Sequence, residues 1–112
     1  MKINKILLSG STTVLILSFL DRKDMYGAEI IKEIKEKSNN AFLFGESTLY
    51  PLLHSLEHKD YVESYVEYGM DPLKRKRKYY KITEYGKKVL SEKEEEWKLF
   101  SSTLNKLLWE LG

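Results

Sequence analysis

The chain has 112 residues, of which 42% are hydrophobic and 32% charged, a composition typical of one soluble globular domain and unlike that of a disordered chain. It contains no cysteine, which excludes disulfides, thiolate metal sites and cysteine nucleophiles. The net charge is only +2, so any affinity for a polyanion has to come from the distribution of charge, with five consecutive cations at 74–78 and four acidic residues within 92–96.

A first helix is predicted from about residue 12 to residue 20, where hydroxyl residues suited to capping precede a run that is apolar on nearly every side. Such a helix has to be covered on more than one side. The run is too short to span a bilayer. Residues 9–13 separate this run from the apolar residues that precede it, and no cleavage site with small residues follows it. We therefore expect no signal peptide, no membrane contact and a cytoplasmic location.

A second helix is predicted over residues 26–37, with Asp24 as its cap and an apolar face containing Ile30 and Ile34. Residues 38–40 should end it, and residues 42–44 should form a short extended link before Gly45 turns the chain.

A third helix is predicted over about residues 47–59, because it has one apolar stripe and one small, polar face. Pro51 is tolerated only near the first turn, so the helix should start no earlier than about residues 46–47. The apolar stripe consists of Leu49, Leu52, Leu53 and Leu56, and the opposite face consists of Ser47, Pro51, His54 and His58.

Two strands are predicted after the third helix, at residues 61–68 and 77–83, joined by turn residues at 69–72. Three helices followed by a hairpin are the order of a winged helix-turn-helix. The predicted fold class is therefore mostly α with a two-stranded β-wing (α+β). Residues 1–83 would be the winged helix-turn-helix with an N-terminal arm, and residues 84–112 a C-terminal dimerisation helix.

The last helix, starting at or interrupted by Thr83 or Ser91, has apolar residues spaced 3, 4, 3 and 4 apart. A seam that continues past a complete small domain needs a partner, either the first helix or a second copy of the chain. If that partner is a second copy, the predicted dimer interface consists of Leu15, Phe19, Trp97, Phe100, Leu104, Leu107, Leu108 and Leu111.

Several segments resemble the PadR family of transcriptional regulators, in its short form with a single C-terminal helix. They are residues 25–27 (MYG), 48–51 (TLYP) and 77–83 (RKYYKIT), with Leu53 and residues 56–57 (LE), and the resemblance extends from residue 10 to about residue 108. It implies a homodimer, usually a repressor, that is joined through its last and first helices. Members often respond to small aromatic or hydrophobic effectors near that interface.

The chain departs from the family pattern at two places. It has His54 and Ser55 where such proteins often carry basic residues, which weakens phosphate or guanine contact from this face. It has Asp60 where the family usually has glycine, and aspartate adopts left-handed conformations less readily than glycine.

Binding to double-stranded operator DNA is expected through the third helix and the wing. The wing cations would contact phosphates, although a run of charges also protects an exposed edge strand. Ser47 and Thr48 would either cap the helix or bind a phosphate, Tyr50 would either bind a phosphate or pack at the helix corner, and His54 would read a base edge. The candidate DNA-binding residues are Tyr26, Ser47, Thr48, Tyr50, Pro51, His54, Lys74, Arg75, Lys76, Arg77 and Lys78.

Trp97 and Phe100 are candidates for stacking on a small aromatic effector, or are simply bulky core residues. His54 and His58 are four residues apart, but no third metal ligand is apparent, so we expect neither metal nor cofactor. No nucleophile–base pair or carboxylate dyad is apparent either, so we expect no enzyme. The alternative function is a winged-helix module for protein–protein assembly, which a salt-dependent complex with palindromic DNA would exclude.

Overall fold

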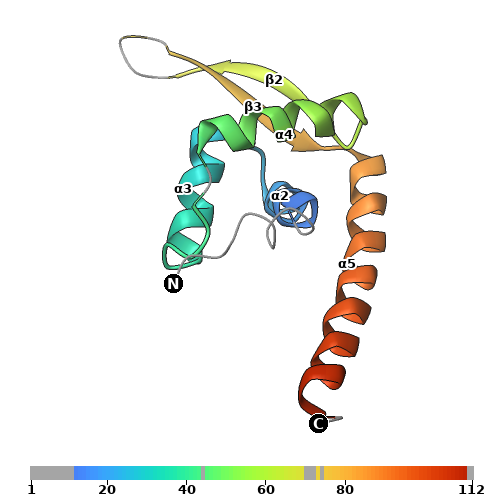
Figure 1. Ribbon diagram of the computed structural model, residues 1–112. Coiled ribbons are helices and arrows are strands. Elements are labelled where there is room, and N and C mark those ends of the chain that lie inside the picture. Colours follow the sequence, from blue (N-terminus) through green and yellow to red (C-terminus); the bar gives the residue numbers. More distant parts are fainter. Residues whose placement is uncertain (1–11, 44, 70–72, 74, 111–112) are drawn as a thin grey trace.

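The structure, a computed structural model, describes residues 12–43, 45–69, 73 and 75–110. The predicted order of three helices, a hairpin and a last helix is confirmed within these ranges (Figure 1). In chain order, the elements are α2 (Thr12–Arg22), β1 (Met25–Tyr26), α3 (Gly27–Lys37), α4 (Glu46–His58), β2 (Val62–Tyr68), β3 (Lys76–Ile82), α5 (Glu84–Asn105) and the π-helical η1 (Lys106–Glu110).

The sheet has three antiparallel strands in the order β1-β3-β2, so a short third strand pairs with the middle of β3 beside the predicted two-stranded wing. The two residues of β1 pair with Tyr79 and Tyr80 of β3. The sequence pattern missed β1, because two residues are too few for a visible alternation. Helix α3 consequently starts at Gly27, one residue later than predicted.

Asp24 does not cap α3, contrary to the prediction. Tyr26 occupies the capping position and makes no side-chain cap, while the Asp24 carboxylate accepts a hydrogen bond of 2.6 Å from the Tyr65 hydroxyl in β2. This hydrogen bond raises the pKa of Tyr65 to about 12, because it stabilises the protonated phenol. Asp24 therefore ties the start of β1 to the wing.

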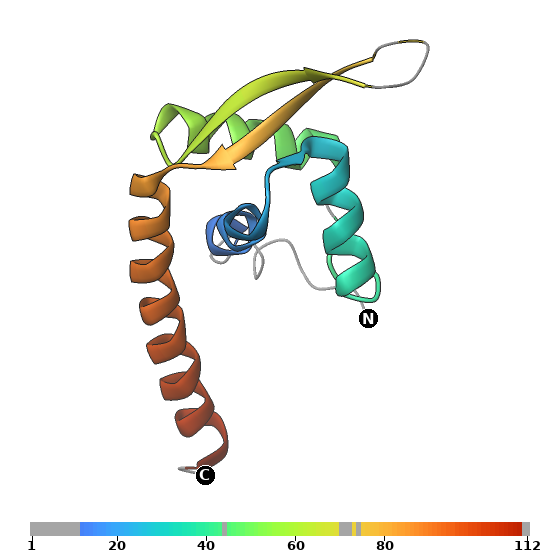
Figure 2. The same ribbon diagram turned by 180° about the vertical axis from the view of Figure 1, so that it is seen from behind.

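The core lies where α2 packs beneath α4 and the sheet, between α3 and the first turns of α5, as the two opposite views show (Figures 1 and 2). The predicted stripe of α4 faces this core, with Leu49, Leu53 and Leu56 buried and Leu52 partly buried. The other buried hydrophobic residues are Ile16, Leu17, Phe19, Leu20, Met25, Ile30, Ile34, Val62, Tyr80, Ile82, Val89 and Leu90.

Helix α4 ends in a turn that requires a left-handed residue, and Asp60 occupies it with φ of 63°. The Asp60 N–H donates to the Glu57 carbonyl and the Tyr61 N–H to the Leu56 carbonyl, each at 3.0 Å. This pair of bonds closes the helix in the manner of a Schellman motif. Asp60 thus adopts the conformation for which glycine is preferred, and the chain passes directly into β2.

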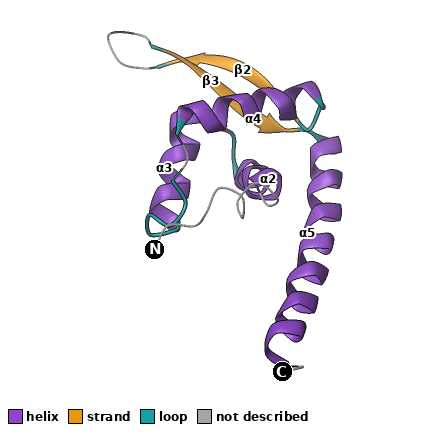
Figure 3. Cartoon of the chain, in the orientation of Figure 1, coloured by secondary structure: helices purple, strands orange, loops and turns teal. Residues whose placement is uncertain are grey.

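The hairpin and α5 leave the helical body in different directions (Figure 3). The outer half of the hairpin extends beyond the helices, while α5 runs past α2 and continues outside the body. None of the described helices combines the length and the apolar character that crossing a membrane requires.

Candidate nucleic-acid interface

The outer face of α4 is exposed and carries the small, polar residues that the sequence predicted there. Gly45 is the capping residue, and its carbonyl accepts hydrogen bonds from the Thr48 N–H at 3.1 Å and the Leu49 N–H at 3.0 Å. The capping interpretation of Ser47 and Thr48 is therefore wrong, because both residues lie one to two positions inside the helix, which starts at Glu46. Their exposed hydroxyls stand at the end of the helix whose dipole favours an anion.

Tyr50 packs at the corner between α3 and α4. A Cβ atom placed on Gly27 would lie 2.6 Å from Cε1 and from the hydroxyl oxygen of Tyr50, so only glycine allows the ring to approach the start of α3 this closely. Burial raises the pKa of Tyr50, yet the residue remains 41% exposed. Tyr50 is thus a packing residue at the edge of the exposed face that also carries Pro51 and His54.

Strand alternation divides the wing cations between two faces of the sheet. Lys76 and Lys78 share the face of Tyr80 and Ile82, which are buried against the helical body. The ammonium nitrogen of Lys78 lies 3.8 Å from the Glu57 carboxylate of α4. The structure therefore places these two lysines on the α4 side of the wing.

Arg77 lies on the opposite face, together with Tyr79. Its guanidinium carbon is 4.7 Å from the ring centre of Tyr26, and the ring of Tyr79 contacts those of Tyr26 and Tyr65 with centres 5.5 Å and 5.6 Å apart. Tyr26 and Arg77 thus belong to an aromatic cluster on the far side of the sheet from Lys76 and Lys78. Arg75 is exposed, and Lys74 lies outside the described residues.

Glu57 links α4 to the wing, a role that sequence reasoning missed. Its carboxylate accepts a hydrogen bond from the Ser64 hydroxyl of β2 and faces Lys78 of β3. Two features of the sequence could have indicated this role. Glu57 follows Leu56 in a segment that resembles the family. Its position at the last turn of a helix that leads into a strand was the remaining clue.

The apolar residues of the last helix are mostly exposed. Trp97 is 44% exposed and Phe100 57% exposed, and their rings stack with centres 5.7 Å apart. Together with Val14 of α2, Lys93 and Glu96, they line a hollow of about 260 Å³ between α2 and α5. The tryptophan and phenylalanine are therefore available to a ligand or to another protein surface.

A second hollow lies along the outer part of α5 and η1. This more open hollow of about 430 Å³ runs from Trp97 and Phe100 past Leu104 to Leu108, and Leu107 does not line it. Leu107 and Leu108 are 59% and 57% exposed, so both stay predicted residues of the seam. Leu111 lies outside the described residues.

The two predicted interface residues of α2 differ in burial. Phe19 is buried within its own chain, with the Lys37 ammonium 5.4 Å from its ring centre, while Leu15 is half-buried. Both line a hollow of about 350 Å³ between α2 and α3, with Ile34 and Phe42. Phe19 therefore contributes to the core of its own chain.

Among the residues that the structure describes, no three histidine, aspartate or glutamate side chains are grouped so as to hold a metal ion. His54 and His58 are both exposed on the outer face of α4.

These features define a winged helix-turn-helix protein, with α3 and α4 as the helix-turn-helix and β2–β3 as the wing. The sequence matches the Transcriptional regulator PadR-like family over residues 16–92, and the chain belongs to that family. It is accordingly a DNA-binding regulator of transcription, in a family of regulators rather than enzymes.

Two solved structures and one further relative are similar to most of the chain. A transcriptional regulator from Clostridium thermocellum is 37% identical, with a TM-score of 0.80 over 89% of this chain and 95% of its own. A PadR-like transcriptional regulator from Bacillus cereus is 29% identical, with a TM-score of 0.79 over 92% and 96%. An uncharacterized protein of Lysinibacillus sphaericus is 43% identical over 91 residues, which are 81% of this chain and 82% of that protein.

Proposed function

We propose that the protein is a homodimeric repressor that binds a specific operator through α4 and the wing and is released by a small aromatic or hydrophobic effector. The observation that carries the proposal is the exposed, uncharged polar face of α4 beside the lysine-bearing face of the wing. A regulator of transcription works beside the chromosome, which agrees with the expected cytoplasmic location.

In this proposal, α4 enters the major groove and the two wing lysines contact the phosphate backbone. Ser47 and Thr48 hold a phosphate at the start of α4, and His54 faces the base edges. This face lacks arginine, asparagine and glutamine for bidentate contacts, so sequence preference rests largely on DNA shape and on the spacing of two half-sites.

The DNA-binding surface is tested by fluorescence anisotropy with DNA from upstream of the protein's own gene and with a shuffled duplex, each at several salt concentrations. The native duplex should bind more tightly, and affinity should fall as salt rises. Lys76→Ala with Lys78→Ala should weaken binding to both duplexes and reduce the slope of log affinity against log salt by about 2.

Lys88→Ala with Lys98→Ala removes the same charge from exposed positions on α5 and serves as the matched control. Equal effects of the two pairs would contradict a wing contact and indicate only a change in total charge. Absence of any complex at low salt would favour the alternative, a winged-helix module that assembles with an acidic protein.

The dimer is supported by the exposed apolar residues of the last helix, which in a monomer would leave a large hydrophobic surface in water. The effector is supported by the stacked pair of Trp97 and Phe100 beside the hollow that Val14 completes. In a Trp109→Phe background, quenching of the remaining tryptophan by planar aromatic compounds, abolished by Phe100→Ala, would locate such a ligand.

A further inference from the structure

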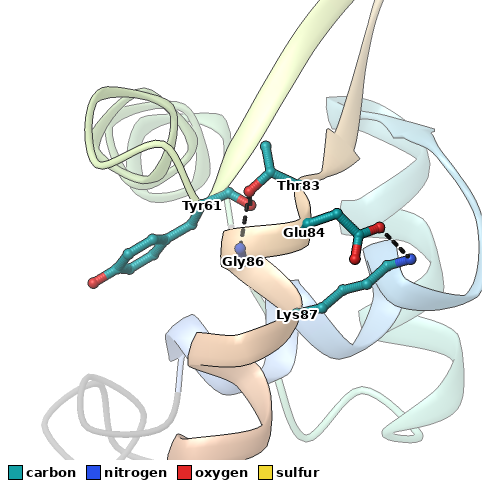
Figure 4. Close-up of polar contacts among 5 residues, drawn as sticks. All are labelled: Tyr61, Thr83, Glu84, Gly86 and Lys87. Carbon is teal, nitrogen blue, oxygen red and sulfur yellow. Dashed lines mark hydrogen bonds and ion pairs between the residues drawn. The ribbon is translucent and has the colours of Figure 1, made fainter.

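A compact joint connects α5 to the end of α4 and to the start of β2. Thr83 is the capping residue of α5, and its hydroxyl oxygen accepts a hydrogen bond from the Gly86 N–H at 2.9 Å (Figure 4). The same hydroxyl donates to the Asp60 carbonyl at 2.7 Å, and the Thr83 N–H donates to the Tyr61 carbonyl at 3.1 Å. One side chain thus joins two segments that are more than twenty residues apart in the sequence.

The first turn of α5 also lies in direct backbone contact with Tyr61. A Cβ atom on Gly86 would overlap the Tyr61 carbonyl and would lie 2.8 Å from Cγ1 of Ile82. Gly86 is buried, and Val89 and Leu90 continue the contact into the core. The residues that end α4 and begin the wing therefore hold the first turn of α5, and α2 packs against the same part of the helix.

We propose that Thr83 is a positioning residue that fixes the angle between α4 and α5 and thereby sets the half-site spacing the protein accepts. The proposal rests on the homodimer proposed above, in which α5 holds the two subunits together and α4 contacts DNA. The distance between the two copies of α4 then follows from the angle at this joint. Protein symmetry and half-site separation are geometrically linked in such dimers.

A simple capping role makes a different prediction from a positioning role. A cap needs only an acceptor for the Gly86 N–H, which Thr83→Asp preserves, since aspartate is a good capping residue. The hydrogen bond to the Asp60 carbonyl needs a donor, which an ionised aspartate lacks and which Thr83→Ser preserves. If Thr83 only caps, both variants should behave like the native protein; if it positions α5, only Thr83→Ser should.

The angle itself can be measured without DNA. Because the chain has no cysteine, His58→Cys on α4 and Glu95→Cys on α5 allow two spin labels at exposed positions. Mixing with excess unlabelled protein restricts the measured distances to pairs within one subunit. We expect Thr83→Asp to broaden the distance distribution about twofold and Thr83→Ser to leave it unchanged. Equal widths in the two variants would overturn the proposal.

The control is Glu84→Ala, which removes the exposed ion pair of 3.4 Å between Glu84 and Lys87 in the same helical turn (Figure 4). It should leave the distance distribution unchanged. Broadening in this variant equal to that in Thr83→Asp would show that any change in the first turn loosens α5, and would contradict a particular role for Thr83. Circular dichroism on every variant confirms that the body is folded.

The second readout is binding to duplexes selected from a random library, in which the distance between half-sites is then changed by one to three base pairs. The native protein and Thr83→Ser should prefer one spacing by about tenfold, and Thr83→Asp should bind all spacings within about threefold. An unchanged preference in Thr83→Asp would refute the proposal. If the native protein forms no dimer or binds no DNA, the proposed function fails, whereas the label distances still decide whether Thr83 fixes the angle.

Discussion

The helical body buries its large apolar side chains, whereas the outer part of α5 leaves similar side chains exposed. All the buried hydrophobic residues that the structure describes belong to the body, between Ile16 and Leu90. Beyond Leu90, the leucines, the phenylalanine and the two tryptophans of the described part of α5 and η1 are between 41% and 76% exposed. Amphipathic spacing therefore identifies residues that share a face, whereas their burial depends on what covers that face.

The largest effect on folding should come from the body. Leu53 is completely buried, so Leu53→Ala should lower the free energy of unfolding by about 3 kcal/mol through lost contacts and a cavity. Leu99 is 69% exposed, so Leu99→Ala should change it by less than about 0.5 kcal/mol. Urea denaturation of both variants tests the contrast. Equal losses would mean that the outer part of α5 is covered as thoroughly as the core.

The next effect concerns assembly. Leu104→Glu places a charge on the proposed seam and should raise the dissociation constant of the dimer about a hundredfold, because that charge would be buried without a partner. Ser91 is exposed on α5 and lines neither of the two hollows beside Trp97, so Ser91→Glu is the matched control and should leave the dimer intact. Sedimentation velocity over a range of concentrations distinguishes the two variants. A dimer that survives Leu104→Glu would reject this seam.

A smaller effect is expected at the boundary between the two regions. In most helices, replacing glycine by alanine stabilises the protein by up to about 1 kcal/mol. At Gly86 the sign should be reversed, with a loss of about 2 kcal/mol, since the new methyl group would overlap the Tyr61 carbonyl. Thermal unfolding of Gly86→Ala beside Lys88→Ala, an exposed change in the next turn, measures this loss. A stabilised Gly86→Ala would contradict the close contact.

The smallest expected effect lies at the end of α4. Asp60 has a φ of 63°, so Asp60→Gly should stabilise the protein by about 0.5–1 kcal/mol by relieving the left-handed conformation. Lys59 has a φ of −83° and gains nothing from glycine, so Lys59→Gly should be neutral or destabilising. Denaturation midpoints compare the two variants. A destabilised Asp60→Gly would show that the aspartate side chain contributes more than its backbone strain costs.

Much of the architecture was predictable from residues close together in the sequence. The leucine stripe of α4 was predicted because its 3.6-residue period is local, and the wing was predicted because its strands flank a short turn. The family resemblance depended on a few short segments and is confirmed by the match over residues 16–92. The roles of individual residues in DNA, dimer or effector contact stay predictions.

Other features depended on partners far away in the chain. Strand β1 exists because Met25 and Tyr26 meet Tyr80 and Tyr79, and Asp24 binds Tyr65 instead of capping α3. The run of five cations looked uniform, yet pairing of β3 with its neighbours puts Lys78 near Glu57 and Arg77 against Tyr26. No local pattern in the sequence indicated that the wing cations lie on two different faces of the sheet.

Sequence patterns were enough to predict the order of the main helices and the hairpin, the inward face of α4 and the chemical character of the wing, because helical and strand periods are set by neighbouring residues. Only packing between distant segments settled which wing cations face α4, that Phe19 belongs to the core of its own chain, and that Gly86 must lack a side chain. These depend on the packing of segments distant in sequence, where the position of one backbone determines the space left for another.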